Sequence, residues 1–270
     1  MPRPAFVETR DGYLLAYRDE GSGPPVVFIH GWSLSGAIWQ PQLEYLVANG
    51  HRVITYDRRG HGHSAKPATG YDYDTLSDDL AAILARTGVT GATLVGHSMG
   101  SGEIARYFAR HGGRHIARTV FVAPTTPFAV KTDDNPEGTD RAAFDQLVAS
   151  FEADAKQYLT AGAPSLVGPD APPETLTWAL DMAYQADPQA LVKCVRAFTE
   201  TDFRSDLGAI QVPTLVVYGT ADLPMIATNA RRTHAAIAGS RLDAYEGAPH
   251  GLFITDRERF NADLLRFARS

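Results

Sequence analysis

Short apolar strands alternate with helical segments along most of this chain, and this alternation restricts the fold more than any other feature. Helical periodicity appears at residues 39–49, 73–87, 99–111, 225–238 and 256–268. Five intervening runs are rich in Val, Ile and Leu, as in strands buried on both faces of a parallel sheet: PPVVFIHG (24–31), RVITYD (52–57), TLVGHS (93–98), TVFVAP (119–124) and TLVVYG (214–219). This order predicts an α/β fold with a doubly wound, mostly parallel sheet.

Two regions depart from the alternation. The segment VETRDGYLLAYRDEG (7–21) predicts an antiparallel hairpin around the turn dipeptide Asp11-Gly12. From about Thr125 to Leu207 no strand pattern appears, and the amphipathic segments are 141–160, 174–185 and 188–199. An insertion of this length between two strands is more typical of a helical lid than of a structureless loop. We therefore expect a core of residues 1–124 and 208–270 and a helical lid of residues 125–207.

Composition excludes several classes of protein. The 270 residues are 44% hydrophobic and 21% charged, which is ordinary for a globular chain, and the net charge of -6 leaves no basic surface for nucleic acid. Cys194 is the single cysteine, so neither an intrachain disulfide nor a cysteine-based zinc site is expected. The N-terminal residues lack the apolar run of a secretory signal, and no segment has the length of a membrane span. We expect a cytoplasmic protein without a membrane or nucleic-acid partner; a homo-oligomer stays open.

The stretch Gly96-His97-Ser98-Met99-Gly100 follows an apolar strand and opens a helix. In this context G-x-S-x-G indicates a nucleophile on a sharp strand-to-helix turn. The serine is forced towards positive φ, and the flanking glycines remove the Cβ atoms that would collide with it. The alternative is an ordinary glycine-rich turn with a solvent-facing serine.

A serine hydroxyl needs a base and an orienting acid to become a nucleophile. Asp222 follows the strand TLVVYG, and His250 follows the short strand RLDAYE, so the order Ser, acid, His is the one found with this turn. We expect Asp222 to fix the tautomer of His250. His250 then removes the Ser98 proton and returns it to the leaving group.

Two backbone amides are candidates for the oxyanion hole. One is the N–H of Met99, directly after the serine at a helix start. The second is the N–H of Trp32, in the loop FIHGWSLSG after the first long parallel strand. The alternative for Trp32 is a plain core aromatic.

No other motif indicates a metal or a cofactor. His61 and His63 are two residues apart in a glycine loop without a third ligand, which favours a structural connection. The G-S-G run at residues 100–102 lacks the lysine and spacing of a phosphate loop. Large apolar side chains of the lid are expected to line an acyl or alcohol pocket, although each is equally typical of lid core: Phe128, Phe144, Trp178, Met182 and Phe198.

Several motifs together resemble the aryl esterases and cofactor-free haloperoxidases of the α/β-hydrolase family. The resemblance extends from Thr9 to Phe267 and is thinnest between Lys131 and Asp187. The segments that carry it are HGWSLSGAIWQPQ, YDRRGHGHSAKP, GHSMGSGEIARYFARHGG, AFTETDF and GAPHGLF with NADLL. It implies an α/β-hydrolase fold and carboxylester hydrolysis without a cofactor, with Ser98, Asp222 and His250 as the triad and Trp32 and Met99 as oxyanion donors.

The sequence departs from this family at two places. Members that form peracids well often have proline after the oxyanion tryptophan, whereas this chain has Ser33, which argues against strong perhydrolysis. In the family, three residues usually separate this aspartate from a proline (D-x-x-x-P), whereas here only Leu223 separates Asp222 from Pro224. This shorter loop predicts a different backbone conformation around the acid.

We therefore expect a serine carboxylesterase that acts on small aryl or short-chain esters through an acyl-enzyme. The alternatives on the same triad are a cofactor-free perhydrolase or haloperoxidase and a lactonase. An alternative of another class is a non-catalytic, ligand-sensing relative.

Overall fold

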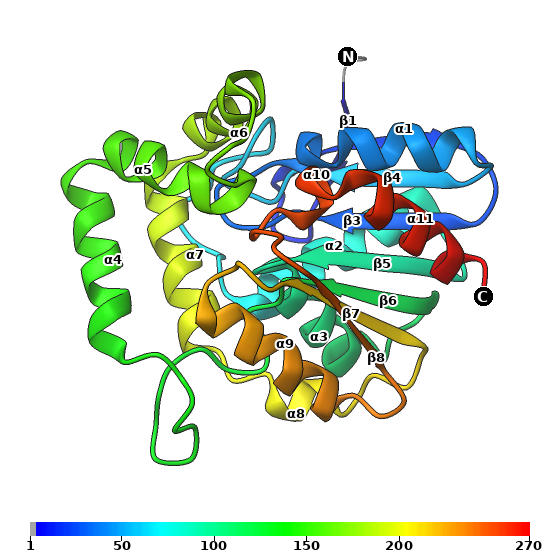
Figure 1. Ribbon diagram of the computed structural model, residues 1–270. Coiled ribbons are helices and arrows are strands. Elements are labelled where there is room, and N and C mark those ends of the chain that lie inside the picture. The colour runs from blue at the N-terminus through cyan, green and yellow to red at the C-terminus, as the bar shows by residue number, and fades with distance from the viewer. Residues whose placement is uncertain (1–3) are drawn as a thin grey trace.

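A single eight-stranded sheet organises the computed structural model, which describes residues 4–270. The strand order is β1-β2-β4-β3-β5-β6-β7-β8; β1 and β2 are antiparallel to their neighbours, and the other strands are parallel (Figure 1). The strands are β1 Ala5–Glu8, β2 Leu14–Gly21, β3 Pro25–Ile29, β4 Arg52–Tyr56, β5 Ala92–His97, β6 Ile116–Val122, β7 Thr214–Gly219 and β8 Arg241–Tyr245. The predicted parallel sheet and N-terminal hairpin are both confirmed.

Helices cover both faces of the sheet. Successive strand residues face opposite sides: Val26 and Phe28 pack with α1 and α11, whereas Val27 and Ile29 share a cluster with α2, α3 and α9. Outside the segment between β6 and β7, the helices are a 3₁₀ turn at Gly36–Trp39, α1 Gln40–Ala48, α2 Tyr73–Thr87, α3 Gly100–His111, α9 Pro224–Ala236, α10 Leu252–Thr255 and α11 Arg257–Ala268.

Local signals account for several of these helix ends. The Asp72 side chain accepts a hydrogen bond from the Thr75 N–H at 2.9 Å and caps the start of α2. Gly88 and Gly112 end α2 and α3 with φ of 62° and 66°, a backbone conformation that favours glycine. The sequence positions of these two helices are therefore predictable from short-range chemistry.

The segment between β6 and β7 forms more helices than we predicted. Its helices are α4 Arg141–Ala153, α5 Ala155–Val167, α6 Pro173–Gln185, α7 Pro188–Glu200 and the short α8 Arg204–Leu207. The single helix expected at 141–160 is wrong: Asp154 is extended, with φ of -155°, and its side chain accepts from the Gln157 N–H at 2.8 Å. This carboxylate ends α4 and caps a new helix, an alternative to helix continuation that aspartate offers.

Figure 1 shows α4 to α7, here called the insertion helices (residues 141–200), gathered on one side of the molecule, away from α11. Their position creates a cavity against the loops that follow β3, β5, β6, β7 and β8. These loops follow the carboxyl ends of the strands, and this is the edge at which open α/β sheets bind ligands. The division into a core and a lid at residues 125–207 stays a prediction.

Candidate active site

Ser98 lies on the turn between β5 and α3 and has a φ of 53°. The flanking glycines are required by close backbone approach. A Cβ at Gly96 would lie 2.7 Å from the Gly100 carbonyl oxygen, and one at Gly100 would lie 2.8 Å from the Ile29 carbonyl oxygen. The strained serine and its glycines therefore follow from one tight packing of β5, α3 and β3.

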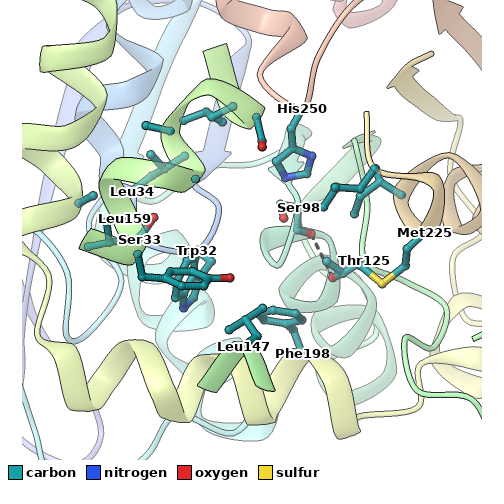
Figure 2. A pocket seen from close by; sticks show the side chains of 18 of the residues that line it. Trp32, Ser33, Leu34, Ser98, Thr125, Leu147, Leu159, Phe198, Met225 and His250 are labelled. Atoms are coloured by element: carbon teal, nitrogen blue, oxygen red, sulfur yellow. Dashed lines mark hydrogen bonds between the residues drawn. The ribbon is translucent and has the colours of Figure 1, made fainter. Parts of the chain in front are cut away.

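Hydrogen bonds hold the Ser98 backbone in this conformation. Its N–H donates to the Val122 carbonyl at 2.9 Å, and its carbonyl accepts from the Ser101 hydroxyl at 2.5 Å. The Thr125 hydroxyl adds a weaker bond to the same carbonyl at 3.4 Å, drawn as a dashed line in Figure 2. Sequence reasoning missed Ser101 and Thr125; the signal for them is a hydroxyl in the first turn after the serine and one after the next strand.

His250 and Asp222 form a close pair at the ends of β8 and β7. The Nδ1 of His250 donates to Oδ2 of Asp222 at 2.7 Å, and the Asp222 side chain is only 1% exposed. The other carboxylate oxygen accepts from the Leu223 N–H at 2.6 Å, so the short connection after Asp222 itself orients the acid. With Nδ1 as the donor, Nε2 of His250 is left to accept a proton.

Ser98 and His250 line the same cavity, and Figure 2 shows the imidazole facing the serine. Ser98 is more than a hundred positions from Asp222 and His250 in the chain, so the fold brings residues after β5, β7 and β8 to one edge of the sheet in the predicted order. His97, directly before Ser98, is buried, and its ring centroid lies 4.6 Å from that of His250. Burial, and then the electrostatic effect of the nearby His250, lower the pKa of His97 well below its usual value, so His97 stays neutral beside His250.

The two predicted oxyanion donors, the backbone N–H groups of Trp32 and Met99, both lie at the carboxyl edge of the sheet, after β3 and β5. Within residues 4–270, the backbone N–H groups of Trp32 and Met99 have no hydrogen-bond partner in the protein. The Trp32 ring also contacts the cavity, and its Nε1 donates to the Leu191 carbonyl of α7 at 2.9 Å. Trp32 therefore serves as a wall of the cavity as well as a candidate amide donor.

The cavity has a volume of about 640 Å³ and is mainly apolar in character. Among the described residues, no Asp, Glu, Lys or Arg lines it. Of the five predicted pocket residues, Phe144 and Phe198 line the cavity. Further lining residues that sequence reasoning missed include Leu34, Leu147, Tyr158, Leu159, Ser165, Leu166, Ala179, Leu180, Ala183, Leu223 and Met225.

Phe128, Trp178 and Met182 do not line this cavity, so that part of the prediction is wrong. Trp178 and Met182 are one turn apart on the face of α6 that packs on the core cluster with Phe253, and Trp178 also borders a second cavity beside α6. The neighbouring face of α6, with Ala179 and Ala183, meets the cavity beside Ser98 instead. Phe128 packs with Val130 and Phe144, with the Arg204 guanidinium 5.5 Å from its ring centroid.

A buried ion pair supports the loop that carries Trp32. Arg58, after β4, donates through Nε to Glu103 of α3 at 2.6 Å and through a second nitrogen to the His30 carbonyl at 2.6 Å. The Tyr56 hydroxyl also donates to Glu103. Burial raises the pKa of Glu103, and Arg58 and Tyr56, which favour its charged form, oppose that rise.

Glu103→Gln is expected to lower the free energy of unfolding by about 3–5 kcal/mol, because it leaves the buried Arg58 charge without its partner. Urea unfolding of both proteins at pH 7 measures the difference. The double variant Arg58→Met/Glu103→Leu removes both charges and is expected to lose less. A loss under about 1 kcal/mol for Glu103→Gln would contradict the argument.

A second buried histidine makes stability depend on pH. Burial, with the Arg58 charge, lowers the pKa of His61 to about 3. Between pH 6.5 and 3 the unfolded chain binds a proton that the folded protein rejects, so stability falls as pH falls. From pH 7 to pH 5 the wild type should lose about 2 kcal/mol more than His61→Gln, at about 1.4 kcal/mol per pKa unit. Urea unfolding at both pH values tests this; equal losses would refute it, since groups common to both proteins cancel.

Within residues 4–270, no cluster of three or more His, Cys, Asp or Glu side chains has the arrangement of a metal site. No helix in that range combines the length and apolar character needed to cross a bilayer.

The sheet order and the strained turn at Ser98 are those of the alpha/beta hydrolase fold, and comparison with known families agrees. A family model described as the alpha/beta hydrolase fold matches residues 24–257, and the chain belongs to this family. It is 41% identical to the non-heme chloroperoxidase CPO-A1 of Kitasatospora aureofaciens, over 96% of this chain and 97% of that protein. It is 35% identical to the bifunctional esterase/perhydrolase DCH of Acinetobacter calcoaceticus, over 98% and 99% of the two chains.

A solved structure shows the same similarity. The esterase from Exiguobacterium antarcticum superposes with a TM-score of 0.95 at 30% identity, covering 99% of this chain and 100% of that one. The resemblance to esterases and cofactor-free haloperoxidases inferred from the sequence motifs is therefore confirmed.

Proposed function

We propose that this protein is a serine carboxylesterase for aryl or short-chain esters that works through an acyl-enzyme on Ser98. The observation that carries the proposal is that Ser98 and His250 share one cavity, while Asp222 lies 2.7 Å from the far nitrogen of His250. The relative named as an esterase/perhydrolase and the esterase of the same fold support this reaction class.

The chemistry follows from these positions. His250 Nε2 takes the proton of the Ser98 hydroxyl as Oγ bonds to the ester carbonyl carbon. The oxygen of the tetrahedral intermediate accepts hydrogen bonds from the Trp32 and Met99 N–H groups, whose unpartnered state suits a developing negative charge. The carbon–oxygen bond then breaks, and the alcohol leaves with the proton from His250. Water repeats the sequence on the acyl-enzyme and releases the acid.

The cavity favours neutral, apolar esters. Its lining within the described chain lacks a charged side chain that would neutralise a substrate carboxylate or ammonium, and burying such a group unpaired is costly. Leu223, 55% exposed, borders both solvent and the cavity and is our candidate for its rim.

Perhydrolysis is the second candidate, favoured by the names of the relatives. In that reaction hydrogen peroxide attacks the acyl-enzyme in place of water, the bond between the acyl carbon and Ser98 Oγ breaks, and a peracid is released while Ser98 regains its proton from His250. Ser33 has a φ of 60°, which proline, fixed near -65°, does not adopt. The loop beside Trp32 therefore has a conformation that a proline there would exclude, and we propose ester hydrolysis as the main activity.

The test of the proposed function is hydrolysis of p-nitrophenyl acetate and butyrate by the wild-type protein. Turnover that depends on Ser98 supports an esterase. Tight binding of a small molecule together with negligible turnover would favour the ligand-sensing alternative, and preferential opening of lactones would favour a lactonase.

A further inference from the structure

The main chain around His250 is hydrogen-bonded to the insertion helix α5. The His250 N–H donates to the Ser165 carbonyl at 3.3 Å, and the Gly251 N–H donates to the Leu166 carbonyl at 2.7 Å. Both acceptors lie in the last turn of α5, where carbonyls have no partner within the helix. The free carbonyls at the end of α5 and the N–H groups of the loop after β8 therefore serve as each other's hydrogen-bond partners.

His250 is also held by residues of the core. Nε2 of His97 donates to the His250 carbonyl at 3.2 Å, and Asp222 holds the His250 ring. The core thus holds the carbonyl and the ring of His250, whereas α5 holds the N–H of His250 and that of the next residue.

Gly251 makes the approach of α5 sterically feasible. A Cβ at this position would lie 2.5 Å from the Leu166 carbonyl oxygen, a backbone atom that moves only with the helix. The φ of Gly251 is -94°, outside the left-handed region that favours glycine, so the contact with α5 is the observed reason for a glycine here.

We propose that the C-terminal turn of α5 positions His250 for catalysis, with Gly251 as the positioning residue that allows the contact. In this arrangement a displacement of α5 displaces the base, so the insertion helices and the triad are mechanically coupled. The effect on turnover rests on the proposed esterase function, whereas the hydrogen bonds are measurable without it.

The test is Gly251→Ala, which separates α5 from the loop without changing a side chain that touches substrate. We expect kcat for p-nitrophenyl butyrate to fall by about tenfold to a hundredfold, as for a displacement of about 1 Å at a reacting group, with KM changed less than about twofold. Amide exchange at residues 250 and 251, followed by NMR, should accelerate. Gly208→Ala is the matched control: its φ is -64° and its new Cβ would meet nothing closer than 3.5 Å.

Three outcomes would overturn the proposal. One is wild-type amides at residues 250 and 251 that exchange as fast as an unprotected peptide, a result that depends neither on the variant folding nor on esterase activity. The second is an unchanged kcat in folded Gly251→Ala. The third is a change in KM alone, which would indicate a reshaped pocket. A wild type without esterase activity but with protected amides would instead refute the proposed function and leave the hydrogen-bonded junction in place.

Discussion

Ser98→Ala is expected to lower kcat/KM for p-nitrophenyl butyrate by about 10⁴-fold or more, because no other group can form the acyl-enzyme. The thermal midpoint should stay close to that of the wild type, since alanine and serine differ by one hydroxyl at this strained position. Initial rates at matched protein concentration, with thermal unfolding of both proteins, give the comparison.

Ser205→Ala is the control for this loss, since Ser205 is exposed on α8, outside the cavity. A Ser98→Ala protein that hydrolyses esters as fast as the wild type would exclude the proposed mechanism. Ser98→Ala also tests whether peracid formation uses the triad. In acetate, hydrogen peroxide and bromide, the bromination of monochlorodimedone by the wild type should disappear in this variant. Halogenation that survives would have to arise outside the triad.

Asp222→Asn is expected to lower kcat by about 10⁴-fold at pH 7, the loss typical when this acid becomes an amide. The carboxylate accepts from Nδ1 of His250 and from the Leu223 N–H, and both bonds need an acceptor. An asparagine amide nitrogen that faces Nδ1 favours the tautomer with the proton on Nε2, which cannot take a proton from Ser98. Single-turnover and steady-state rates on p-nitrophenyl butyrate measure the effect.

Asp181→Asn, on an exposed position of α6 outside both cavities, removes the same charge and should leave kcat unchanged. If Asp222→Asn kept more than about a tenth of the wild-type kcat, another group would have to orient His250.

The features that were predictable from sequence are those decided within a few residues. The turn at Ser98 was predictable because the two glycines and the serine are needed in one tight loop. The ends of α2 and α3 were predictable for the same reason, through an N-cap aspartate and C-terminal glycines. Asp154 shows the limit: its side chain could either face solvent in a continuous helix or cap a new one, and the periodicity of apolar residues is compatible with both.

The pocket shows a second limit. Trp178 and Met182 were expected in it because they are large and apolar, but α6 turns them towards the core and presents Ala179 and Ala183 to the cavity. Because α6 packs on the core with one face and borders the cavity with another, both faces are apolar. Hydrophobicity alone therefore does not show which face meets the cavity.

By itself, the sequence determined the α/β class, the strained turn at Ser98 and the order of serine, acid and base, because strand periodicity, glycine geometry and turn chemistry act locally. Only the tertiary structure decided which face of each insertion helix borders the cavity, and that the end of α5 supports His250. The contacts of α5 with His250 and Gly251 join segments more than eighty residues apart, and the geometry of all these contacts depends on how whole helices dock on the sheet.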